Sequence, residues 1–170
     1  AATHHYGAAG YCKALTVMAH LKKIIEAHHG IDAFIVPYFI APYFYLAENK
    51  LAARRKKRIL LYPKHAEDND YRILKRLLLQ ALGPLQNKTS ETWEVLELKN
   101  KTHEETAALM QDSIFFINLT YYEALNSTVP EAMAAGCICF CYDAFGPLDF
   151  LQNGVNAYVY PNHHVYPLLE

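Results

Sequence analysis

Two glutamates separated by seven residues are the side chains whose type and spacing first suggest chemistry. Glu123 and Glu131 lie in the segment 121–137, YYEALNSTVPEAMAAGC, the first in an expected loop and the second at the start of an expected helix. A loop carboxylate can accept hydrogen bonds from sugar hydroxyls, and one in a first helical turn can hold the two hydroxyls of a ribose. The helix start also presents unpaired amides and a positive dipole end, which suit a phosphate group.

The second glutamate also has a purely structural interpretation. Thr128 and Glu131 match the capping-box pattern T-x-x-E, with Pro130 in the first helical turn. In that interpretation Glu131 satisfies backbone amides at the helix start and needs no ligand. Spacing alone leaves both interpretations open.

The elements that must position these residues follow a regular order from residue 58 onward. Short β-branched or aromatic runs alternate with helical stretches, which is the pattern of a parallel sheet with crossover helices. The expected strands cover 58–63, 93–98, 114–119, 137–142 and about 157–160, and the expected helices cover about 69–82, 104–111 and 130–135. The sequence therefore predicts an α/β fold, a Rossmann-like parallel sheet with helices on both faces.

The strand that precedes the two glutamates has the composition of a central strand. Residues 114–119, IFFINL, are nearly all apolar, as expected of a parallel strand covered on both faces. Open α/β sheets place their ligand crevice at the carboxyl ends of such strands. The segment 121–137 is therefore expected to border a crevice.

Local signals mark where two of the helices begin or end. Thr102 and Glu105 form a capping box ahead of the helix at 104–111. Gly83 and Pro84 are expected to stop the preceding helix near residue 82.

The first part of the chain differs in composition from the rest. A helix is expected over about 16–29, closed by Gly30, and residues 34–45, FIVPYFIAPYFY, hold six aromatics and two prolines, as in a connector. We expect residues 1–50 to be the end of a preceding domain with its connector, and residues 51–170 to be the Rossmann-like domain.

Composition and charge exclude several classes of protein. The 170 residues are 52% hydrophobic and 19% charged, which excludes an intrinsically disordered chain. The formal net charge is -1, so no overall positive field attracts nucleic acid, and we expect no nucleic-acid partner. The run 50–58, KLAARRKKR, carries six cations; it is interpreted as a solvated linker, with peripheral membrane contact as the alternative.

Cysteine and histidine patterns argue against a metal or a disulfide scaffold. Cys137, Cys139 and Cys141 alternate along one strand, so they are expected to lie on one face as reduced core residues. The pairs of adjacent histidines have no zinc-ligand spacing, and we interpret them as surface residues. With no export signal or membrane-spanning apolar stretch in this sequence, we expect a cytoplasmic protein, with the inner face of a membrane as the alternative site.

The acidic triplet at residues 68–70 has two interpretations. Asp68-Asn69-Asp70 matches a D-x-D metal motif, but it also sits where acidic residues cap a helix. We favour capping and expect no metal site.

The combined motifs resemble a known family. E-x7-E followed by A-M-A-x-G-C, with a later G-P-x-x-F-x-x-N-G-x-N-A, is similar to the C-terminal, nucleotide-sugar-binding domain of GT-B fold retaining glycosyltransferases of family 4. The resemblance covers roughly residues 58–160. It implies a donor-binding domain in which a nucleotide-diphosphate sugar is the substrate and neither a cofactor nor a metal is required.

The resemblance also implies roles for single residues. Glu123 matches the glutamate that lies against the donor sugar, and Lys64 falls where the family places a cation on the donor diphosphate. The usual glycine-arginine pair and the later lysine are not evident, so His65 is expected to replace the second cation and to make phosphate neutralisation pH-dependent near neutrality. Glu123 and Lys64 are the expected catalytic residues.

Further positions are expected to bind the donor. Glu131 matches the glutamate that hydrogen-bonds the ribose, and the loop beginning at Leu98 lies where the family's backbone contacts the base. The amides of Asn126, Ser127 and Thr128 would face the phosphates or the sugar. The family's usual aromatic-glycine pair is replaced here by Leu125-Asn126.

Two functions from different classes follow from these observations. The leading one is a glycosyltransferase fragment that transfers a sugar with retention; in the family the acceptor, a sugar, glycan or lipid, is held by an N-terminal domain that this chain largely lacks. We therefore expect nucleotide binding without efficient transfer by this chain alone. The alternative is a non-catalytic Rossmann-like interaction module that docks on a partner or a membrane surface.

Overall fold

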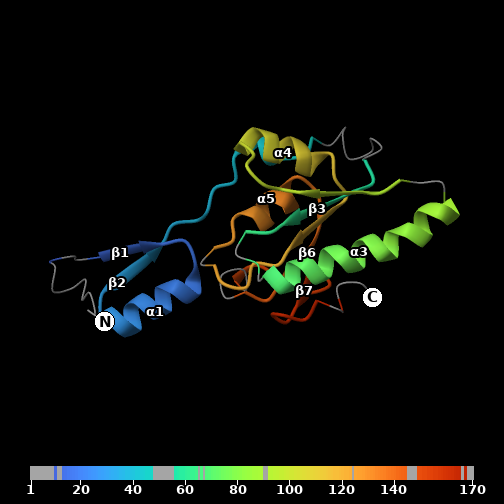
Figure 1. The fold of residues 1–170 in the computed structure, drawn as a ribbon. Helices are drawn as coiled ribbons and strands as arrows, with labels where there is room; N and C mark the ends of the chain where they lie inside the picture. Colours follow the sequence, from blue (N-terminus) through green and yellow to red (C-terminus); the bar gives the residue numbers. More distant parts are fainter. Residues whose placement is uncertain are drawn as a thin grey trace. The chain divides into compact units, whose positions relative to one another are not determined.

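The computed structural model describes residues 10, 13–47, 56–64, 66, 68–89, 92–123, 125–144, 149–165 and 167. The chain divides into two compact units, Ala1–Phe39 and Ile40–Glu170 (Figure 1). The sequence predicts a boundary between residues 50 and 51 instead. The division falls earlier because Phe44, in the short 3-10 helix η2 (Pro42–Phe44), is fully buried in the core of the second unit.

The first unit is a β-α-β element. Strands β1 (Lys13–Thr16) and β2 (Asp32–Ile35) pair in parallel, and helix α1 (Ala19–His29) connects them. The prediction of a helix from residue 16 and of a connector from residue 34 is wrong at these positions, because Thr16 ends one strand and residues 34 and 35 end the other. The predicted helix stop at Gly30 is confirmed: this glycine has a left-handed backbone with φ 64°.

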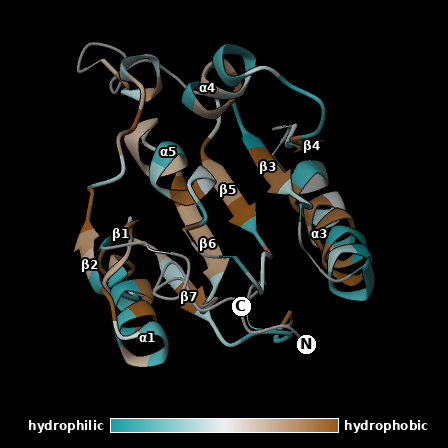
Figure 2. Ribbon diagram, turned by 90° about the vertical axis from the view of Figure 1, so that its left-hand side faces the viewer, coloured by the Kyte–Doolittle hydropathy of each residue, from teal (hydrophilic) through white to brown (hydrophobic). Residues whose placement is uncertain are grey.

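The second unit is an α/β fold with a five-stranded parallel sheet, which confirms the predicted fold class. The strand order is β4-β3-β5-β6-β7, and every pair in it is parallel (Figures 1 and 2). The strands are β3 (Arg58–Tyr62), β4 (Glu94–Glu97), β5 (Phe115–Asn118), β6 (Ile138–Tyr142) and β7 (Tyr158–Tyr160). The helices are α3 (Asp68–Thr89), α4 (His103–Gln111) and α5 (Thr128–Ala134).

Alternate residues of the central strands pack into two cores, one on each face of the sheet. Leu60 packs with the cluster that holds α4 and α5, where Met110 and Val129 are fully buried. Its neighbour Leu61 packs with the opposite cluster, where Leu74 of α3 is fully buried. The helices therefore cover both faces, as the nearly continuous apolar strands predict.

Helix α3 runs past its predicted stop. It continues through Gly83 and Pro84 to Thr89, although an interior proline removes an intrahelical hydrogen bond and crowds the preceding turn. Beyond the proline, the side-chain amide of Gln86 donates to the carbonyl of Trp93 at 3.1 Å and fixes the extra turn against the start of β4.

The predicted capping box of α4 is confirmed. Thr102 Oγ1 accepts from the Glu105 amide at 3.2 Å, and Glu105 Oε2 accepts from the Thr102 amide at 2.9 Å. The cysteine prediction is also confirmed, since Cys137, Cys139 and Cys141 are free thiols buried in one core.

The described part of the basic run 50–58 contacts the protein itself. Arg58 is buried in β3 and pairs with Glu94 at 2.7 Å, and Lys56 lies 3.1 Å from Asp112. Residues 50–55 lie outside the described residues. Among the helices that the structure describes, none is long and apolar enough to cross a bilayer.

Candidate functional site

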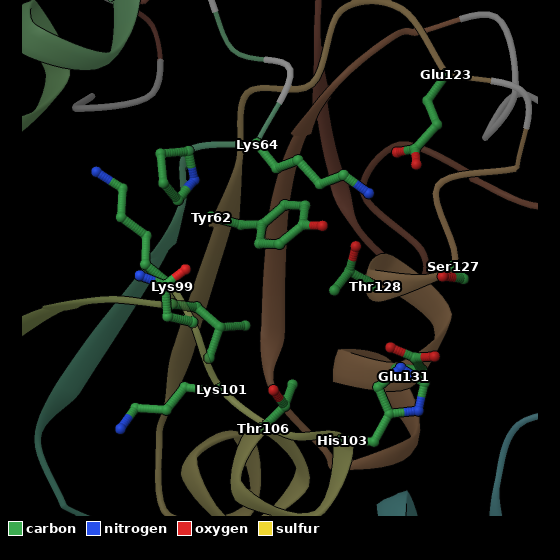
Figure 3. A pocket seen from close by; sticks show the side chains of 13 residues that line it. Tyr62, Lys64, Lys99, Lys101, His103, Thr106, Glu123, Ser127, Thr128 and Glu131 are labelled. Carbon is green, nitrogen blue, oxygen red and sulfur yellow. The ribbon is translucent and has the colours of Figure 1, made fainter.

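A cleft of about 470 Å³ opens at the carboxyl ends of β3, β4 and β5 (Figure 3). The chain leaves β3 for β4 on one side and returns to β5 on the other, so the cleft lies at a topological switch point, where open α/β sheets bind ligands. The residues that line it come from the strand ends and the loops that follow them: Tyr62, Pro63, Lys64, Leu98, Lys99, Asn100, Lys101, His103, Thr106, Glu123, Ser127, Thr128 and Glu131.

The structure brings most of the predicted site residues together in this cleft. They are Lys64, Leu98, Glu123, Ser127, Thr128 and Glu131. Asn126 is not among the lining residues, because its side chain is buried beneath the loop. His65, the expected second cation, lies outside the described residues.

The Glu123 carboxylate has a buried oxygen without a hydrogen-bond partner. Its Oε2 atom is shielded from solvent, and no donor among the described residues reaches it. Figure 3 shows the carboxylate and the Lys64 ammonium pointing into the same part of the cleft. Leaving a buried acceptor unsatisfied costs about 1–3 kcal/mol. Recovering this energy with a ligand hydroxyl requires the side chain to turn this oxygen toward the cleft that Glu123 lines.

A buried polar network fixes the positions of Lys64 and Glu123 relative to each other. Thr120 Oγ1 donates to the Lys64 carbonyl at 2.8 Å, and the Thr120 amide donates to Asn118 Oδ1 at 2.8 Å. Asn118 Nδ2 in turn donates to Asn126 Oδ1 at 2.8 Å, which joins the two ends of the loop that carries Glu123. Asn126 thus holds the loop closed through its side chain, and its backbone is left-handed, with φ 52°.

The capping-box interpretation of Glu131 is wrong. The N-cap of α5 is Ser127, which makes no side-chain cap bond, and the Thr128 hydroxyl lies 3.3 Å from Asn126 Oδ1. Glu131 is only 4% exposed and lines the cleft. Because α5 spans only seven residues, its dipole is short, and positive charge in the cleft must come mainly from side chains.

Cations on the loop between β4 and α4 were missed by the sequence reasoning. Lys99 and Lys101 both line the cleft, on either side of Asn100, whose backbone is left-handed with φ 51°. Lys101 is 41% exposed and lies 4.0 Å from its nearest carboxylate, on Glu105. Both cations belong to the run KNKTH, which directly follows an expected strand. From the sequence, only the backbone of this loop is expected to contact the base.

Lys99 is held in place by an ion-pair network next to the cleft. Glu97 Oε2 lies 2.8 Å from Lys99 Nζ, and Glu97 Oε1 lies 2.5 Å from Lys75 Nζ on α3. Hydrogen bonds from the two lysines, with a further one from Tyr71, lower the pKa of Glu97 to about 2. The network ties the β4 end to α3.

Among the described residues, no group of three or more His, Cys, Asp or Glu side chains is arranged to hold a metal ion. Independence from metals stays a prediction.

The second unit matches known proteins in both sequence and fold. Residues 86–168, just under half of the chain, match the family model described as Glycosyl transferases group 1. This segment includes β4 and the whole Glu123–Glu131 segment, so the part of the chain that carries much of the cleft is similar in sequence to this family. A search of the curated proteins finds no match to the chain.

Solved structures with the GT-B fold resemble the chain. The pneumococcal O-GlcNAc transferase GtfA, in complex with UDP and GlcNAc, has a TM-score of 0.64 at 13% identity, over 96% of this chain and 37% of its own. TarM has a TM-score of 0.65 at 15% identity, over 96% and 36%. S. aureus TarM in complex with fondaparinux, alpha-GlcNAc-glycerol and UDP has a TM-score of 0.64 at 14% identity, over 96% and 36%.

The chain thus spans little more than a third of the length of these proteins. At 13–15% sequence identity, this structural similarity establishes the fold alone.

Proposed function

We propose that this chain is the donor-binding half of a retaining glycosyltransferase, which moves a sugar from a nucleotide diphosphate to an acceptor. The observation that carries the proposal is the Glu123 carboxylate, which has a buried, unpartnered oxygen and points into a cleft that also holds Lys64. An acceptor atom maintained at an energetic cost suits a ligand rich in hydroxyl donors. A cation in the same cleft suits an anionic leaving group.

The cleft offers two kinds of contact for the two parts of such a donor. Glu123 accepts hydrogen bonds from the sugar, and Lys64 neutralises the diphosphate as it departs, which lowers the barrier electrostatically. Glu131 accepts the ribose hydroxyls, and the 98–101 loop borders the base, with Lys101 adding charge at that end. His65 remains the proposed second cation.

The donor class finds support in the solved proteins with this fold. Structures of GtfA and TarM contain UDP, and the GtfA complex also contains GlcNAc. Because the chain spans little more than a third of those proteins, we propose that the acceptor, a sugar, glycan or lipid, is bound by additional chain. The chain alone should therefore bind nucleotide but transfer sugar poorly.

We also propose that the reaction needs no metal or cofactor and takes place in the cytoplasm. Peripheral contact with the inner face of a membrane would use the basic run 50–58, of which Lys56 and Arg58 are engaged in ion pairs.

Calorimetric titration of the chain with UDP, GDP and ADP tests the proposed donor site. At least one nucleotide should bind, and Lys64→Met should weaken it about 10- to 100-fold, because a charge-assisted hydrogen bond to phosphate contributes about 1.5–3 kcal/mol. Lys56→Met removes the same charge at an exposed position outside the cleft and is the matched control. Absence of binding by all three nucleotides would refute the proposal.

A further inference from the structure

Two motifs that the proposed function leaves unused meet in the folded chain. Asp70 comes from the acidic triplet at the start of α3, and His163 comes from the histidine pair near the end of the chain. His163 Nδ1 lies 2.9 Å from Asp70 Oδ2, although 93 residues separate them. The Tyr142 hydroxyl donates to the same oxygen at 3.0 Å. Asp70 is thus more than a helix cap, and His163 more than a surface residue.

The two partners of this contact have different surroundings. The Asp70 side chain is only 13% exposed, whereas that of His163 is 52% exposed. A nearly buried carboxylate requires donors, and Tyr142 and His163 supply them. The imidazole therefore covers the carboxylate from the solvent side and joins the C-terminal segment to α3.

The backbone at His163 is held in a costly conformation. Its φ is 66°, in the left-handed region, which costs a residue with a Cβ about 1 kcal/mol relative to the right-handed helical region. Such a conformation persists when surrounding contacts compensate for it. The contacts here are the Asp70 bond and two aromatic neighbours, with ring centroids 5.4 Å away on Tyr121 and 6.3 Å away on Tyr142.

Tyr121 connects this contact to the cleft. It directly follows Thr120, whose hydroxyl holds the Lys64 carbonyl, and it precedes Glu123 by two residues. The His163 ring thus packs on Tyr121, in the loop that carries Glu123. The C-terminal turn that presents His163 is itself anchored, because Asp143 Oδ1 accepts from the Asn162 amide at 2.9 Å and Val165 is buried.

We propose that Asp70 and His163 form a clasp that positions Glu123 by supporting Tyr121. Neither side chain lines the cleft, so both are positioning residues and not catalytic ones. The proposal rests on the proposed function, since it concerns how well Glu123 is placed for the sugar. It assigns a role in donor binding to the C-terminal turn, which lies outside the cleft wall.

The test compares two ligands, because only one of them contains the group that Glu123 is proposed to contact. His163→Asn removes the imidazole but keeps a residue type that tolerates a left-handed backbone. Its affinity for the nucleotide-diphosphate sugar should fall about tenfold, and its affinity for the same nucleotide diphosphate without sugar should stay within about twofold. Asp70→Asn should produce the same split.

His164→Asn is the matched control, because the neighbouring histidine is exposed and its side chain makes no contact in the clasp. A ligand-free measurement complements the titrations: amide hydrogen exchange at residues 121–123 should quicken in His163→Asn and not in His164→Asn.

Each result has a distinct meaning. Equal losses for both ligands, or no loss in either clasp variant, would overturn the clasp while leaving the donor site intact. Unchanged exchange at residues 121–123 in His163→Asn would also overturn it. A wild-type chain that binds neither ligand would refute the proposed function, and the clasp's role in donor binding with it.

Discussion

Replacing Glu123 with glutamine separates the cost of its carboxylate in the free protein from its benefit in the complex. The Oε2 atom is buried without a donor, so the free protein bears a desolvation cost of about 1–3 kcal/mol. Because the side chain as a whole is only half-buried, the lower end of that range applies. Glu123→Gln keeps the shape, removes the charge and should raise the free energy of unfolding by about 1 kcal/mol. In a unit of this size that corresponds to about 3 °C in Tm.

The same substitution should weaken binding of the nucleotide sugar about 5- to 10-fold, because a hydrogen bond to a charged group contributes about 1.5–3 kcal/mol and a neutral one about 0.5–1.5 kcal/mol. Thermal unfolding followed by circular dichroism and calorimetric titration measure the two effects. Glu104→Gln, at an exposed position on α4, is the control and should change neither quantity appreciably. A variant that is less stable than the wild type by 3 °C, or one that binds the nucleotide sugar equally well, would show that Glu123 serves the fold.

Other features of the second unit lead to further expectations. Asn118→Ala removes the donor to Asn126 and should lower the free energy of unfolding by about 2 kcal/mol in urea titrations. Thr102→Ala breaks the α4 capping box and should cost about 1 kcal/mol in the same assay; an unchanged midpoint would contradict its role. Lowering the pH should destabilise the protein as Glu97 protonates: its stabilising charge is complete above its usual pKa of 4.5 and is lost as the pH falls toward its folded pKa of about 2. Glu97→Gln should abolish this part of the acid dependence, on the order of 1 kcal/mol because the pairs are partly exposed.

Sequence patterns predicted the structure correctly where the residues of the pattern contact one another. The capping box at Thr102 and Glu105 involves groups only three residues apart, so the pattern alone specifies the contact. The alternating cysteines likewise needed only the two-residue period of a strand to place them on one face. The fold class followed from the same kind of short-range pattern.

Two local predictions failed because distant contacts override the pattern. The T-x-x-E match at Thr128 has the spacing of a cap, but the Thr128 hydroxyl turns to Asn126, and the buried Glu131 faces the cleft. Pro84 does not end α3, because the following turn is fixed through Gln86 to β4. In both cases the deciding partner belongs to another element.

The assembly of the candidate site was predicted in part. A sheet's carboxyl edge collects the loops that follow its strands, so Lys64 and Glu123 could be expected near each other. The hydrogen bonds from Thr120 and Asn118 that hold these two residues in place could not be predicted, because they depend on the geometry of the loop. The pairing of Asp70 with His163 was equally hidden, since no short-range pattern connects residues 93 positions apart.

The three core cysteines give the chain an internal reporter of unfolding. Burial raises the pKa of the Cys141 thiol to about 12 and that of Cys139 beyond the usual range, so these two thiols form little reactive thiolate in the folded chain. Alkylating reagents can reach these buried sulfurs only when the core between the sheet and helices α4 and α5 opens. The rate of modification at Cys137, Cys139 and Cys141 therefore measures opening of this core without an added label, and a ligand that stabilises the cleft should slow it.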